Sequence, residues 1–222
     1  MKNLTSYTDI NALLNKVENS LLILEAKYNE SLHNQVVSPE LLVEVKDILG
    51  NLRSSLDFLS HKFSKNNFPI CDGVSDFENR SKDFSASIQL ILEKWQPFKG
   101  NEWLGQFNIL NNKSKHITLI PQKRTEVIET RVTHPQGGSV SWGQGVTFGS
   151  GVSVMGVPID PRTQLPVANN MVKTERIVWV NFAFDIEGIA ELPNNILVLP
   201  FLKICFEKIV QIINEVSAAD NE

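Results

Sequence analysis

The sequence is poor in cysteine and in arginine, and it has no long uninterrupted apolar run. Its two cysteines, Cys71 and Cys205, lie far apart in unlike surroundings, which excludes a disulfide framework and a zinc ribbon. With 222 residues, 42% of them hydrophobic, the chain is long enough to bury a core without such supports. We therefore predict a folded chain that needs no metal and no cofactor.

No segment is apolar enough to cross a membrane. The most apolar stretch, residues 196–213, is interrupted by Pro200, Lys203 and Glu207. The N-terminus lacks a basic stretch followed by an apolar run and a cleavage site, so we predict no signal peptide. The expected location is cytoplasmic, with no membrane contact.

Basic charge is scarce overall, because the net charge is -4 and only six of the 21 basic residues are arginine. Arginine is the better bidentate phosphate ligand, and general duplex-binding surfaces are usually more basic than this. Residues 99–133 differ, with six basic and three acidic groups. This basic island, from Lys99 to Arg131, is the segment that would contact RNA.

Apolar residues at steps of three and four predict two long helices in the N-terminal part. The first set is Ile10, Leu13, Leu14, Val17, Leu21, Leu24 and Tyr28, and the second is Leu42, Val45, Leu49, Leu52, Leu56, Leu59 and Phe63. Ser38-Pro39-Glu40 is typical of a helix start, with an N-cap, a proline in the first turn and an acid on the helix dipole. The two helices are expected to pair as an antiparallel hairpin.

The rest of the chain changes from helical to strand character. Shorter helices are predicted at residues 84–95 and 103–110, strands at 116–121, 125–132 and 176–186, short strands with tight turns at 137–156, loops at 71–75 and 158–170, and a closing helix at 200–216. Helices first and strands second predict an α+β fold, with an N-terminal helical bundle, an antiparallel β region and a C-terminal helix. We divide it into a helical region, 1–115, and a β region with the closing helix, 116–222, packed as one unit.

The second predicted helix carries Arg53, Asp57 and His61 at i, i+4 and i+8, which places them on one helical face. An acid in the middle of such a line can hold the arginine and fix the orientation of the histidine. The default interpretation is a structural network at the edge of the core.

A second polar cluster, Asn112-Lys113-Ser114-Lys115-His116, lies where helix gives way to strand. Together the two clusters would supply groups for metal-independent cleavage of RNA. In that alternative His61 and His116 act as acid and base. Arg53 and Lys115 stabilise charge, and Asp57 orients its neighbours.

Three stretches, LRSSLDFLSHKF, FPI and WQPFKGNEWLGQFNILNNKSKH, resemble a family of uncharacterised bacterial proteins. Its members have LRSALDHL, FPI, QPY and L-x-x-L-N-x-x-DKH in that order, over about residues 50–120 here. The positions taken to match are Arg53, Asp57, Asn112, Lys115 and His116. Ser114 stands where that family usually has an acid.

More distantly, the helical half resembles HEPN domains, the helical modules of bacterial toxin and defence ribonucleases. Those domains carry an arginine and a histidine on one helix and usually dimerise to build one site. Seven residues separate Arg53 from His61 here, a wider spacing than the HEPN pattern has.

Three functions follow as hypotheses. The first is a cytoplasmic bacterial binding protein, whose helical hairpin contacts another protein or a second copy. The alternative is a metal-independent endoribonuclease of toxin or phage-defence type, which predicts His61 and His116 at one open cleft. The third is RNA binding without cleavage, through Asn112, Lys113, Lys115, Lys123 and Arg124. The first hypothesis, a binding protein without catalysis, predicts that Arg53 and Asp57 are buried as a pair.

Overall fold

The computed structural model describes residues 7–34, 37–116, 119–143, 145–167, 171–186, 192–193 and 195–220; among these, the side chains of residues 29–34, 116, 127 and 179 are not described. Helices begin and end this part of the chain, and antiparallel strands lie between them in the sequence. The predicted α+β fold class is confirmed.

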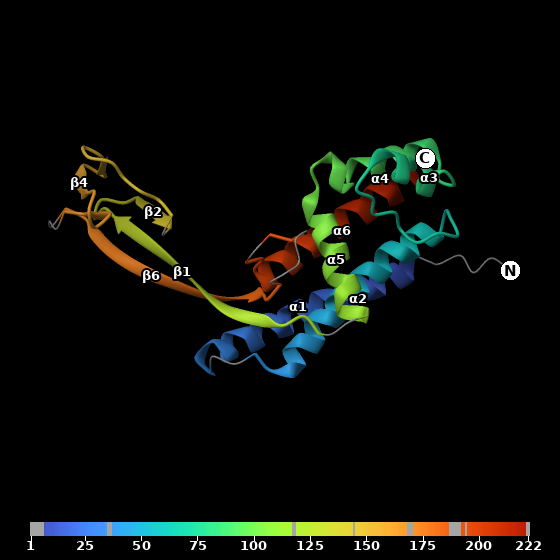
Figure 1. The fold of residues 1–222 in the computed structure, drawn as a ribbon, viewed down its shortest axis with the longest axis horizontal. Helices are drawn as coiled ribbons and strands as arrows, with labels where there is room; N and C mark the ends of the chain where they lie inside the picture. The colour runs from blue at the N-terminus through green and yellow to red at the C-terminus, as the bar shows by residue number, and fades with distance from the viewer. Residues whose placement is uncertain are drawn as a thin grey trace. The chain divides into compact units, whose positions relative to one another are not determined.

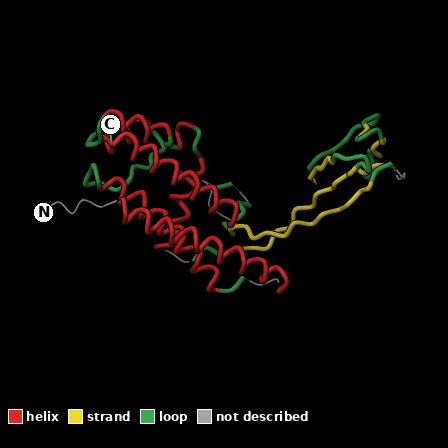
Figure 2. The backbone as a smooth tube through the Cα atoms, turned by 180° about the vertical axis from the view of Figure 1, so that it is seen from behind, coloured by secondary structure: helices red, strands yellow, loops and turns green. Residues whose placement is uncertain are grey.

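Contacts divide the chain into two compact units. The helical unit comprises Met1–Lys123 and Phe182–Glu222, and the β unit comprises Arg124–Asn181. Two long strands, β1 (Gln122–Thr133) and β6 (Lys173–Phe184), carry the chain from one unit to the other and back. They run side by side in Figure 1 and in Figure 2.

The helical unit is built on an antiparallel hairpin of α1 (Tyr7–Asn34) and α2 (Pro39–His61), as the periodicity predicts (Figure 1). The helix start at Ser38-Pro39 is also found where expected, with Pro39 in the first turn. The Ser38 side chain does not cap the helix, however. Its backbone carbonyl accepts hydrogen bonds from the amides of Leu41 and Leu42 instead.

Four short helical elements follow: α3 (Val74–Ser81), α4 (Ala86–Lys94), the 3₁₀ turn η1 (Pro97–Lys99) and α5 (Glu102–His116). The prediction of a loop at residues 71–75 misses α3. The prediction that the last of these helices stops at Asn111-Asn112 is also wrong, because α5 continues to His116. Asn111 and Ser114 are buried there, and the Ser114 hydroxyl donates to the Asn111 carbonyl at 2.8 Å.

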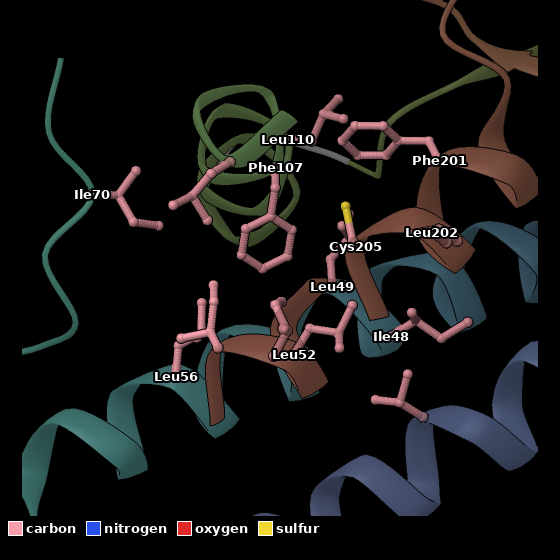
Figure 3. Close-up of a cluster of buried hydrophobic side chains, with 14 of the residues drawn as sticks. Ile48, Leu49, Leu52, Leu56, Ile70, Phe107, Leu110, Phe201, Leu202 and Cys205 are labelled. Atoms are coloured by element: carbon pink, nitrogen blue, oxygen red, sulfur yellow. The ribbon is translucent and has the colours of Figure 1, made fainter. Parts of the chain in front are cut away.

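The closing helix α6 (Val198–Asp220) packs on α1, α2 and α4 and belongs to the helical unit, although the sequence pattern groups it with the strands. Figure 3 shows part of the resulting core, in which labelled side chains from α2, α5 and α6 meet. Leu49, Leu52 and Leu56 come from α2, Phe107 and Leu110 from α5, and Leu202 and Cys205 from α6.

The β unit has two small sheets. In the first, of order β2–β1–β6, strand β2 (Ser139–Gly143) pairs antiparallel with β1, and Thr130 lies opposite Trp142. The β1–β2 turn contains Gly137 and Gly138 with φ angles of 106° and 88°, which glycine adopts without strain. The second contains β3 (Ser153–Val154), β4 (Val157–Asp160) and β5 (Leu165–Pro166).

Two strand predictions need correction. Within the stretch predicted as a loop at residues 158–170, residues 158–160 belong to strand β4 and residues 165–166 form strand β5. Residues 119–121 are not a strand, so β1 begins at Gln122, and residues 117 and 118 lie outside the description.

Candidate functional site

The predicted polar line on α2 contains a tight ion pair. Arg53 Nη2 lies 2.9 Å from Asp57 Oδ1, and Arg53 Nε donates to Asp57 Oδ2 at 3.2 Å. Two parallel contacts of this kind hold both planar groups in one orientation. Arg53 is 8% exposed, so the pair lies at the edge of the core as the sequence predicts.

The same two side chains bind the backbone of Phe68. Arg53 Nη2 donates to the Phe68 carbonyl at 3.0 Å, and the Phe68 amide donates to Asp57 Oδ1 at 3.0 Å. Both oxygens of Asp57 are therefore engaged by Arg53 and Phe68, and among the described residues no side-chain hydrogen bond or ion pair joins Asp57 to His61. The pair anchors a loop to α2.

Two further side chains hold the next residues of that loop. The fully buried Gln96 accepts from the Cys71 amide at 2.9 Å and donates to the Pro69 carbonyl at 3.0 Å. Arg80 Nη1 donates to the Ile70 carbonyl at 3.1 Å. Each carbonyl from Phe68 to Ile70 thus accepts a hydrogen bond from a side chain. We call the segment Phe68–Cys71 with these four side chains, Arg53, Asp57, Arg80 and Gln96, the loop clamp.

The loop clamp contains two of the five positions taken to match the family pattern, Arg53 and Asp57, together with residues of the FPI and QPF segments. Arg53 and Asp57 come from LRSSLDFL, the segment at 68–70 is FPI, and Gln96 begins QPF. Sequence positions far apart in that pattern meet in one hydrogen-bond network. The sequence analysis did not identify Gln96 or Arg80 as partners. The only signal for Gln96 was its place before Pro97 in the QPF motif.

Burial shifts the pKa of Arg53 in the clamp. Desolvation lowers the pKa of Arg53, Asp57 acts to raise it, and Arg80 acts to lower it. A guanidinium remains charged under such shifts because its ordinary pKa is so high. One of its nitrogens, Arg53 Nη1, is buried and has no hydrogen-bond partner among the described residues.

Cys71 ends the clamped segment and is buried. Burial raises the pKa of its thiol to about 12, a hydrogen bond with Asp76 adds to this, and the nearby Arg80 opposes it. The thiolate is the nucleophilic form of cysteine, so a thiol with this pKa is unreactive at neutral pH.

The two predicted catalytic histidines lie at the ends of different helices. His61 is exposed in the last turn of α2, and its imidazole forms no hydrogen bond or ion pair with a described residue. His116 ends α5, and its side chain lies outside the described residues. In Figure 1 the end of α5 leads toward the start of β1, whereas α2 ends on the side of the N-terminus. A shared cleft for the two imidazoles stays a prediction.

The predicted binding residues differ in their surroundings. Asn112 and Lys115 are exposed, and Lys113 is half-buried, all on the last turns of α5. Lys123 Nζ lies 3.7 Å from Asp185 Oδ1, and Arg124 Nη1 lies 2.7 Å from Glu126 Oε1. Two cations of the basic island are therefore partly neutralised by acids.

One buried amide on α5 was not predicted. Asn111 is 1% exposed, and neither its Oδ1 nor its Nδ2 has a partner among the described residues. The predicted candidate was its neighbour Asn112, which is exposed. Sequence spacing alone does not distinguish adjacent asparagines at a helix end.

Within the described part of the chain, no three His, Cys, Asp or Glu side chains come together in a group that could hold a metal ion. No described helix is long and apolar enough to cross a membrane. Comparisons with protein-family models, with curated proteins and with solved structures find no match for this chain.

Proposed function

We propose that this protein works by binding, and that the α1–α2 hairpin contacts another protein or a second copy of the chain. The observation that carries the proposal is the loop clamp. Arg53 and Asp57, the centre of the alternative catalytic site, are paired with each other and with the Phe68 backbone. Groups committed in this way stabilise a fold and are not available to a substrate.

The outer faces of the helical unit offer apolar contacts. Leu22 and Ile23 on α1 are 63% and 45% exposed, and Val43 on α2 is 43% exposed. Single exposed apolar residues are ordinary, but two large neighbours on one turn of a long helix form a small contact site. Binding of another protein would remove Leu22 and Ile23 from water.

Site-specific photocrosslinking in the native cells tests this proposal. A photoreactive phenylalanine analogue in place of Ile23 should give a covalent adduct, either with a second copy or with another protein. The same analogue in place of Asn11, an exposed residue about three turns earlier on the same helix, is the matched control and should give none. Adding Leu22→Glu to the Ile23 variant should abolish the adduct.

Absence of an adduct at position 23, or equal adducts at both positions, would contradict the proposal. So would cleavage of RNA by the purified protein in EDTA that is lost in both His61→Ala and His116→Ala. That second result would instead support the endoribonuclease alternative, for which the exposed His61 imidazole is the favourable observation.

A further inference from the structure

A polar hollow of about 520 Å³ lies beside the loop clamp. The lining residues come from the loop after α2 and from the end of α3: Lys65, Asn66, Asn67, Asn79, Arg80 and Lys82. Three of them are cations, three are primary amides, and none is a carboxylate. This volume falls in the range of pockets that hold small ligands.

Most of the donor groups of this hollow are uncommitted. Lys65 and Lys82 form no ion pair with any described residue, and the side chains of Asn67 and Asn79 form no hydrogen bond with one. The nearby acids engage only two lining residues. Asp83 accepts from Asn66 Nδ2 at 3.4 Å, and Asp76 Oδ2 lies 3.8 Å from Arg80 Nη1. Two full positive charges therefore remain without a partner in the described part of the chain.

The walls of the hollow are held by buried contacts. The buried Ser60 hydroxyl donates to the Asn66 carbonyl at 2.7 Å, and Arg80 Nη1 donates to the Ile70 carbonyl. The loop clamp fixes the chain directly after Asn67. Because these contacts hold the backbone before any ligand arrives, little backbone conformational entropy is lost on binding.

The two arginines near the hollow already have acidic partners. Arg53 is paired with Asp57, and Arg80 Nη1 lies 3.8 Å from Asp76 Oδ2. Lys65 and Lys82 have no ion-pair partner among the described residues, so an anion in the hollow would mainly neutralise these two lysines.

We propose that this hollow binds the phosphate groups of a small phosphorylated ligand, with Lys65, Arg80 and Lys82 as counter-charges and the asparagine amides as additional donors. Lysine, arginine and amide N–H groups are all donors, so they match the acceptor oxygens of phosphate. The lining contains no aromatic side chain, so the hollow provides no surface for stacking a base. The partial negative charge at the end of α3 opposes an anion, but it amounts to about half a charge against the two full charges of Lys65 and Lys82.

Calorimetric titration of the full chain with inorganic pyrophosphate tests the assignment. Wild-type protein should bind it saturably at low ionic strength, and Lys65→Ala/Lys82→Ala should weaken binding at least tenfold, which corresponds to about 1.4 kcal/mol. Lys16→Ala/Lys46→Ala removes the same charge from lysines outside the lining and should leave affinity within about twofold. Lys65→Arg/Lys82→Arg keeps both charges and should retain most of the binding.

Circular dichroism and thermal unfolding establish that each double variant is folded before it is titrated. Failure of the wild type to bind pyrophosphate, or an equal loss in the two alanine variants, would overturn the proposal. A single-stranded oligodeoxythymidine that binds more tightly than pyrophosphate, and loses binding in the Lys65→Ala/Lys82→Ala variant, would also overturn it. That outcome would assign the hollow to a nucleic-acid backbone.

Discussion

In the helical unit the side chain of Gln96 is fully buried and bonds to the backbone of Pro69 and Cys71, whereas in the β unit Gln164 performs a similar task when only half-buried. Gln164 Oε1 accepts from the Phe148 amide at 2.5 Å, and its Nε2 donates to the carbonyls of Phe148 and Pro161. Water can replace the bonds of the second amide but not those of the first. The same side chain is therefore expected to stabilise the helical unit more than the β unit.

Among the described residues, the hydrophobic core of the β unit is also smaller than that of the helical unit. The helical core joins residues distant in the sequence, such as Ile10, Phe68, Leu104 and Ile212, each of them fully buried. Among the described residues of the β unit, the buried cluster consists of Val132, Trp142 and Ile159, with partly buried neighbours around it. We infer that the β unit opens at lower free energy than the helical unit.

The largest expected effect is a difference in hydrogen exchange between the units. Backbone amides at residues 49–56 of α2 should exchange about 10,000-fold more slowly than those at residues 139–143 of β2, because local opening requires less free energy where few apolar contacts are buried. Exchange measured by NMR or mass spectrometry at fixed pH checks this. Equal protection would mean that the two units unfold together, and it would contradict the inferred difference in their free energies of opening.

The loop clamp gives the next largest effect. Asp57→Ala leaves Arg53 buried without its counter-charge, which should lower the free energy of unfolding by about 3–5 kcal/mol. Asp47→Ala is the matched control, because Asp47 is an exposed acid of the same helix and should cost about 0.5 kcal/mol or less. Urea denaturation followed by circular dichroism measures both. Equal losses would show that the clamp contributes no more than a surface ion pair.

The smallest effect concerns a contact between α4 and α6. Burial acts to raise the pKa of Glu215, but hydrogen bonds from Lys94 at 2.7 Å and Trp95 at 3.0 Å outweigh it, so the pKa lies below its ordinary 4.5. A carboxyl group with a lowered pKa in the folded state stabilises above pH 4.5, and this contribution is lost as pH falls through the folded pKa.

Glu215→Gln should therefore flatten the acid side of the stability–pH curve, by about 0.5 kcal/mol because the pair is partly exposed. Glu207→Gln, at an exposed position of the same helix, is the control and should leave the curve unchanged. Thermal unfolding between pH 3 and pH 7 is the measurement. A curve that is unchanged in Glu215→Gln would mean that the contact between α4 and α6 does not contribute to stability.

Periodicity predicted the long elements and failed for the short ones, for a physical reason. The helices α1 and α2 bury a complete apolar stripe, which repeats often enough to be recognised. The helix α3 has eight residues and buries only Phe77 and Ser81, so no period can be seen in it. Strands β4 and β5 have four and two residues and were hidden in a predicted loop for the same reason.

The candidate site was predictable only where its contacts are local. Arg53 and Asp57 are four residues apart, so their pairing follows from helical spacing. Their bonds to Phe68, and those of Gln96 to Pro69, join residues 11 to 27 positions apart and depend on how the loop folds back. The helix and strand propensities of the residues do not predict such a contact. The hollow lined by Lys65 and Arg80 depends on the same fold-back.

The strands that leave and re-enter the helical unit do so at neighbouring points. The Asp185 amide donates to the Pro121 carbonyl at 2.8 Å, and Lys123 Nζ lies 3.7 Å from Asp185 Oδ1. Residues 124–181 are thus an insertion into the helical unit between α5 and α6. The contacts of Asp185 with Pro121 and Lys123 hold the two ends of this insertion together. In modular terms, we expect that the β unit can be shortened, lengthened or replaced by a short turn while the helical unit keeps its fold, so that the two units could evolve separately.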